Sequence, residues 1–115
     1  MSLENHQLAE AFCRWKFTEV YPYFADEIKW NAVGRNEYVG REAVIAQCEE
    51  ATKFLATVTT LYDKLKIHRA ETCVIVEGTA QFQDREKRTL SVASCDVFRF
   101  AEDRLVEITS YVIDL

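Results

Sequence analysis

Apolar residues recur at helical spacing in two parts of the chain. In residues 3–17 they return every three or four positions, at Leu8, Ala11, Phe12 and Trp15, which predicts an amphipathic helix. A short second helix is predicted from Thr18 through Phe24. A third is predicted over residues 41–55, where one apolar stripe is made by Val44, Cys48, Ala51 and Leu55.

The other apolar residues alternate with polar ones, as in strands. A short strand is predicted over Ile28–Val33, a loop over Gly34–Gly40, and four long strands over residues 57–67, 73–82, 89–100 and 104–113. On the first long strand one face is predicted to carry Leu61, Asp63, Leu65 and Ile67. Helices followed by a meander of strands predict an α+β fold, with the helices on one face of a curved antiparallel sheet. At 115 residues, we expect a single domain, 1–115.

The strand at residues 89–100 is largely apolar on both faces. One face carries Leu90, Val92, Ser94, Asp96, Phe98 and Phe100, and the other carries Ser91, Ala93, Cys95 and Val97. A sheet with one face in water shows a cleaner alternation. We therefore expect the helices and any cavity on one face, and a second subunit on the other, in a homodimer through the outer face of the sheet.

Charge and motifs exclude several function classes. The net charge of −5 disfavours nucleic acid as a partner, because phosphate contacts need a basic surface. No apolar run reaches the roughly 18 residues of a membrane span, and the N-terminal segment does not resemble a signal peptide, so we expect no membrane partner and a cytoplasmic location. No cysteine or histidine has the spacing of a metal site, so neither a metal nor a cofactor is expected.

Asp96 is the candidate catalytic residue. It interrupts a face that otherwise carries aliphatic and aromatic side chains. A buried carboxylate needs a partner or a raised pKa, and such groups occur at working sites as well as in structural networks. Two readings stay open. Asp96 is either a structural aspartate bonded to the backbone or to a neighbouring side chain, or a general acid/base beside a pocket.

Two blocks of the sequence resemble a known superfamily. YFADEIKW (residues 23–30), followed by a loop and GREAVIAQ (residues 40–47), and the later DVFRFAEDRLVEITSY (residues 96–111) resemble SnoaL-like members of the nuclear transport factor 2-like fold. That resemblance extends from the first helix to Val112. It implies a cystatin-like cone, in which the sheet wraps round the helices and encloses an apolar pocket.

Ketosteroid isomerases share this fold, and Asp96 falls where they carry the carboxylic acid of their oxyanion hole. Their proton-shuttling aspartate would lie at Ala32, and their oxyanion-hole tyrosine near Leu8. Both of these side chains are missing here, so the resemblance does not imply steroid isomerisation by that mechanism.

The resemblance and the strand faces together predict which residues bind a ligand. They are Phe12, Tyr21, Trp30, Cys48, Phe98, Ile108, Ser110 and Val112. Core packing explains Trp30 equally well, and a hydrogen bond to a backbone carbonyl explains Ser110 more simply.

The sequence thus predicts a protein that binds an apolar small molecule. It would be an isomerase, cyclase or lyase-type enzyme that uses Asp96 as acid/base or oxyanion donor. The alternative is a non-catalytic, dimeric ligand-binding or scaffold protein of the same fold.

Overall fold

The computed structural model describes residues 3–115, which form three α-helices, a 3₁₀ turn and one sheet. The helical segments are α1 (Asn5–Cys13), α2 (Phe17–Val20), the 3₁₀ turn η1 (Tyr21–Tyr23) and α3 (Arg41–Leu55). The strands are β1 (Phe24–Ala32), β2 (Glu37–Val39), β3 (Val58–Arg69), β4 (Cys73–Asp84), β5 (Thr89–Ala101) and β6 (Arg104–Asp114). The predicted α+β class is confirmed.

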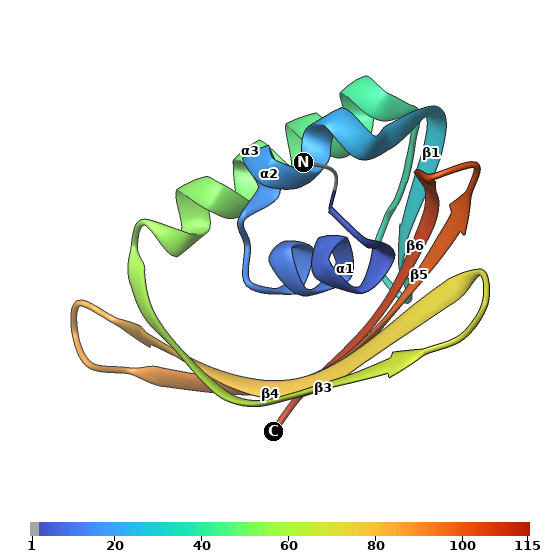
Figure 1. Cartoon of the computed structure of the whole chain (residues 1–115). Helices are drawn as coiled ribbons and strands as arrows, with labels where there is room; N and C mark the ends of the chain where they lie inside the picture. The colour runs from blue at the N-terminus through green and yellow to red at the C-terminus, as the bar shows by residue number, and fades with distance from the viewer. Residues whose placement is uncertain (1–2) are drawn as a thin grey trace.

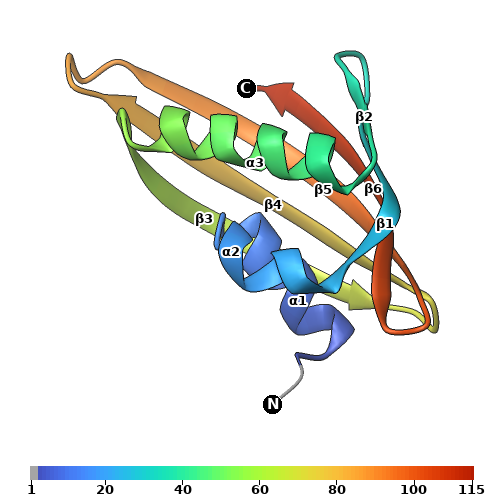
Figure 2. The same ribbon diagram turned by 90° about the horizontal axis from the view of Figure 1, so that it is seen from above.

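The six strands form one curved sheet in the order β2-β1-β6-β5-β4-β3. All neighbouring pairs are antiparallel except β1 with β6, which run parallel. Figure 1 shows the sheet bent like a bowl around α1, with α3 across its open side. From above, α3 and the α1–α2 pair cover different parts of the same face (Figure 2). Within residues 3–115, no helix covers the other face of the sheet.

The core lies between the helices and the concave face of the sheet. In α1, the predicted stripe is buried at Leu8, Ala11 and Phe12, and α1 packs against β4. In α3, Val44 and Cys48 are fully buried, and this helix packs against β1. Burial of these stripes explains why the helical periodicity was readable in the sequence.

The segment between α1 and α3 differs from the prediction in three places. The first helix ends at Cys13 and not at residue 17, so Trp15, with a φ of 64°, lies in the turn that follows it. The second helix ends before Phe24, which is extended and begins β1, because the 3₁₀ turn around Pro22 interrupts the helical hydrogen bonding. The predicted loop at Gly34–Gly40 contains β2, which pairs with β1 at Trp30 and Tyr38. A three-residue edge strand needs only backbone partners, so it leaves little signal in the side-chain pattern.

No helix within residues 3–115 has both the length and the apolar character needed to cross a membrane.

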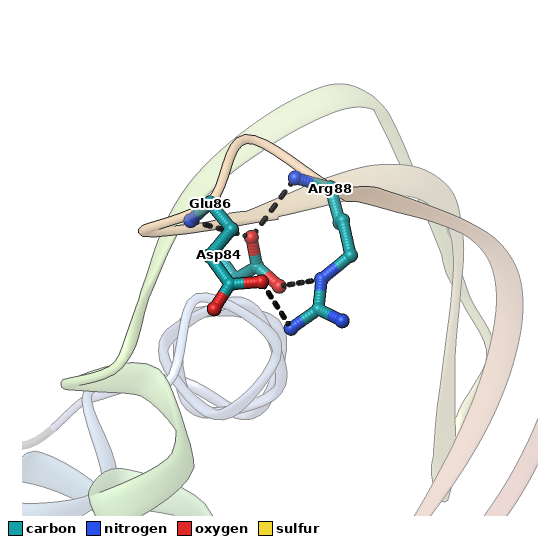
Figure 3. A network of polar contacts seen from close by, with 3 residues as sticks. All are labelled: Asp84, Glu86 and Arg88. Carbon is teal, nitrogen blue, oxygen red and sulfur yellow. Dashed lines mark hydrogen bonds and ion pairs between the residues drawn. The ribbon is translucent and has the colours of Figure 1, made fainter.

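The hairpin between β4 and β5 is closed by a compact polar network (Figure 3). The Asp84 carboxylate accepts hydrogen bonds from the backbone N–H groups of Glu86 and Arg88, both at 2.9 Å, and from Arg88 Nε at 2.8 Å. The Arg88 guanidinium also lies 3.1 Å from the Glu86 carboxylate. These donors, first of all the Arg88 backbone N–H, hold the pKa of Asp84 below its usual value of 3.8.

Asp84→Ala is expected to destabilise the protein at neutral pH and to have a smaller effect in acid. A carboxyl group whose pKa is lowered by folding stabilises the native state above its unfolded pKa, and this contribution is lost as pH falls through the folded value. Chemical denaturation at neutral pH and well below pH 3.8 checks this, with the exposed Asp26→Ala as control. An effect of Asp84→Ala that is the same at both pH values would contradict it.

Candidate functional site

A cavity of about 630 Å³ lies between the helices and the concave face of the sheet. Its walls come from α1, α2, α3 and strands β1 to β6. The lining is largely apolar, and six of its side chains are the phenylalanines and tryptophans Phe12, Trp15, Phe17, Trp30, Phe54 and Phe82. The exposed side chains of Arg35 and Asn36 also line it, so the cavity opens to solvent beside the β1–β2 turn. A space of this size and character suits an apolar small molecule.

Asp96 lies on the wall of this cavity, on β5. The register of the sheet places Ser110 of β6 opposite Asp96, and the parallel pairing of β1 places Ala32 beside Ser110. From β1, Trp30 Nε1 donates a hydrogen bond to Ser110 Oγ at 2.9 Å. From the end of α1, the Cys13 thiol donates to Asp96 Oδ2 at 3.7 Å. Residues of α1 and β6 therefore lie beside the carboxylate on β5, and β1 contributes through the bond from Trp30 to Ser110.

The electrostatic environment of Asp96 has two opposing parts. Burial among apolar side chains raises the pKa of the carboxyl, while hydrogen bonding from Ser110 and from Cys13 acts to lower it; burial is the larger effect. A half-buried carboxyl with a raised pKa can accept a proton in one step and return it in the next.

Cys13 acts on Asp96 as a hydrogen-bond donor. Its pKa is raised well above the usual value, first by burial and then by the adjacent Asp96 charge. A thiol in these surroundings stays protonated and is a poor nucleophile. Its position beside Asp96 could not be inferred from the sequence, because the two residues are 83 positions apart.

Tyr62 is a polar cavity residue that sequence reasoning missed. The alternation predicted for β3 is broken by a β-bulge between Tyr62 and Lys64, so Tyr62 and Leu65 both line the cavity while Leu61 is 60% exposed. Gly78 lies opposite the bulge, where a Cβ atom would overlap the carbonyl oxygen of Lys64. The glycine in this strand is the one signal in the sequence that marks the close approach.

Four predicted ligand-binding residues line the cavity, namely Phe12, Trp30, Ser110 and Val112. Three others, Cys48, Phe98 and Ile108, are instead fully buried in the core. The ring of Phe98 lies edge-to-face behind Phe12 at 5.5 Å between centroids, and so Phe12 forms the wall in its place.

Tyr21 does not line the cavity either. It packs against Phe24, with 5.7 Å between ring centroids, and burial raises its pKa to about 12. Alternation along a strand predicts on which side of the sheet a residue lies, but it does not predict which other side chains lie between that residue and the cavity.

Within residues 3–115, no three His, Cys, Asp or Glu side chains lie close enough together to hold a metal ion.

Comparison with known proteins gives a family match and several similar structures. The family model of the SnoaL-like domain matches residues 6–108. An NTF2-like protein of unknown function from Cytophaga hutchinsonii is 30% identical, with a TM-score of 0.81 over 92% of this chain and 93% of that chain. No curated protein matches the sequence.

Two more distant structures share the fold. An epoxide hydrolase of the LEH-like type from M. tuberculosis is 18% identical, with a TM-score of 0.71 over 94% of this chain and 81% of that one. A protein provisionally named SnoaL-like polyketide cyclase, from Shewanella denitrificans, is 13% identical, with a TM-score of 0.72 over 93% of this chain and 88% of that one.

Proposed function

Because this chain belongs to the SnoaL-like family, we propose that it binds an apolar small molecule in the cavity and moves a proton of that molecule with the Asp96 carboxylate. The observation that carries the proposal is a carboxyl group with a raised pKa on the wall of a largely apolar cavity. Two structural neighbours bear the names of enzymes that act on small organic molecules. The reaction class is that of an isomerase, cyclase or lyase.

The chemistry begins at a C–H bond made acidic by a neighbouring carbonyl group. The bond breaks, its electron pair enters the enolate, and the proton passes to Asp96. Return of the proton to another carbon gives an isomer, attack of the enolate on a second carbonyl closes a ring, and loss of a leaving group gives an alkene. A base whose pKa lies above the usual aspartate value is better suited to the first step.

Deuterium exchange of 2-tetralone tests this proposal. This bicyclic ketone is small enough for the cavity and carries acidic C–H bonds beside its carbonyl. In D₂O, the protein is expected to accelerate exchange at these carbons above the rate in buffer, as measured by proton NMR. Bound ketone that exchanges no faster than in buffer would overturn the catalytic proposal.

A non-catalytic ligand carrier is the second candidate. It is favoured by the contacts of Asp96, whose partners Ser110 and Cys13 belong to the protein itself, as they do for a structural aspartate. The same experiment separates the two functions: a carrier binds the ketone, seen as line broadening of its resonances, without accelerating exchange.

We further propose that the outer face of the sheet pairs with a second copy of this chain. Tyr111 and Ile113 of β6 are 49% and 61% exposed there, on the face without helices. They border a cleft of about 370 Å³ that is also lined by Lys66 and Glu77. These two residues are register partners on the neighbouring strands β3 and β4. Across a two-fold axis the same patch meets itself, so the lysine of one copy can approach the glutamate of the other.

Ile113→Lys is expected to weaken the dimer by roughly 100-fold, because it buries an unpaired charge in the interface. Sedimentation velocity across a concentration series measures the association. Val39→Lys on β2 is the matched control, since Val39 is a β-branched strand residue that is 56% exposed and lies on an edge strand. A wild-type protein that stays monomeric, or an Ile113→Lys variant that associates as tightly as wild type, would contradict this interface.

A further inference from the structure

The hydrogen bond between Trp30 and Ser110 joins residues that are 80 positions apart in the chain. It is short, at 2.9 Å, and both residues line the cavity. Ser110 is itself buried, and its register partner on β5 is Asp96. The three side chains therefore follow one another along a row that crosses β1, β6 and β5.

The chemistry of these groups determines which of them donates and which accepts each hydrogen bond in the row. An indole N–H can only donate, so the Ser110 oxygen must be the acceptor of the bond from Trp30. A hydroxyl that accepts through its oxygen keeps its own hydrogen free to donate. Hydrogen bonding from Ser110 acts on the Asp96 carboxyl in the direction that favours its ionised form.

The thiol of Cys13 approaches the same carboxyl from α1, and it too is a donor. Cys13 and Ser110, which is the register partner of Asp96 on β6, are therefore the side chains positioned to offer a hydrogen to Asp96. Such donors stabilise an ionised carboxylate, in which both oxygens accept, more than a protonated carboxyl, which has fewer accepting sites.

We propose that Trp30 and Ser110 are positioning residues, forming a relay of donors that holds the Asp96 carboxylate against β6 as a proton acceptor facing the cavity. This deepens the proposed function and rests on it for the use of the carboxylate. Donors to the carboxylate favour the ionised form that a general base needs, whereas an oxyanion donor would need a protonated Asp96.

Other titratable groups share the cavity with Asp96. Those that line it are Cys13 from α1, Glu50 from α3, Arg35 and Tyr38 from the β1–β2 hairpin, Tyr62 and Lys64 from β3, and Asp114 from β6. The influences that act on the Asp96 pKa are burial, Ser110 and Cys13. A titration of Asp96 is therefore expected to report chiefly on its burial and on the two donors.

The first test needs neither a variant nor a ligand. The indole ¹H–¹⁵N resonance of Trp30 is followed through a pH titration of the wild-type protein, while the carboxyl ¹³C resonance of Asp96 is followed in parallel. The Trp30 resonance is expected to shift with the same midpoint as Asp96, because protonation weakens the bond from Ser110 and thereby alters the bond from Trp30. Trp15 is the internal control, since it also lines the cavity and the described residues supply no acceptor for its indole.

Variants test the direction of the relay. Ser110→Ala is expected to raise the Asp96 pKa by about one unit, since a donor to the charged form is lost. Trp30→Phe keeps an aromatic ring and removes the N–H, so it is expected to raise the Asp96 pKa by a smaller amount. In the Ser110→Ala background Trp30→Phe should add nothing, while Ser110→Thr should retain the wild-type value.

The relay is refuted if the Trp30 indole resonance stays flat through the Asp96 titration, or if Ser110→Ala leaves the Asp96 pKa unchanged or lowers it. Equal effects of Trp30→Phe with and without the Ser110 hydroxyl would also refute it. None of these measurements involves a substrate. They therefore succeed or fail independently of the 2-tetralone experiment, which tests the proposed function itself.

Discussion

Asp96→Asn is expected to slow the protein-catalysed deuterium exchange of 2-tetralone by about 10²–10⁴-fold, the usual contribution of a general base. The amide has nearly the shape of the carboxylate and still accepts a hydrogen bond from Ser110, but it cannot take a proton from carbon. Proton NMR of the ketone measures the rate.

The fold should survive this change, since the variant removes a carboxyl group whose burial opposes its charge. Asp26→Asn, the same chemical change at an exposed position on β1, is the matched control and should exchange at the wild-type rate. If Asp96→Asn exchanges the ketone as fast as wild type, Asp96 is not the base.

The rate should also depend on pH in a defined direction. The base acts in its ionised form, so wild-type exchange above the buffer rate falls as pH decreases through the Asp96 pKa. Because burial raises that pKa, the fall begins at a higher pH than for an ordinary aspartate.

Phe98→Ala is expected to destabilise the protein by about 3–5 kcal/mol, the usual cost of replacing a fully buried phenylalanine by alanine. Phe98 is 0% exposed and packs edge-to-face against Phe12, so the substitution leaves a void behind the cavity wall. Against a total stability of about 5–15 kcal/mol for a native domain, the loss is large. Urea denaturation followed by circular dichroism measures it.

Val112→Ala is the control for Phe98→Ala, because it truncates a side chain that lines the cavity and not one in the core. Val112 lines the cavity and is 40% exposed, so its truncation should cost less than about 1 kcal/mol. If Phe98→Ala cost no more than Val112→Ala, Phe98 would not have the core position described here.

Only part of the candidate site could be predicted from the sequence. Alternation along residues 89–100 showed that Asp96 shares a face with Phe98 and Phe100, and the structure places that face toward the helices. The same alternation misplaced Tyr62, because a β-bulge inserts one residue and reverses the faces after it. The mark of this bulge in the sequence is Gly78, which lies on the partner strand β4 and not on β3 itself.

The parallel pairing of β1 with β6 is a second feature that the pattern did not reveal. Alternation within a strand is the same whether its neighbour runs parallel or antiparallel. This pairing is what brings Trp30 to Ser110, so the sequence contained both residues without indicating that they meet.

Local periodicity determined the helices and strands β1 and β3–β6, their order, and the side of the sheet to which Asp96 belongs. Burial of one face imposes that periodicity, which is why a single sequence displays it. Tertiary structure alone decided that Cys13 and Ser110 lie beside the carboxylate, that Trp30 bonds to Ser110, and that Phe98 lies behind Phe12 instead of lining the cavity. Such contacts depend on strand register and helix placement across some 80 residues, and these are properties of the whole packed domain.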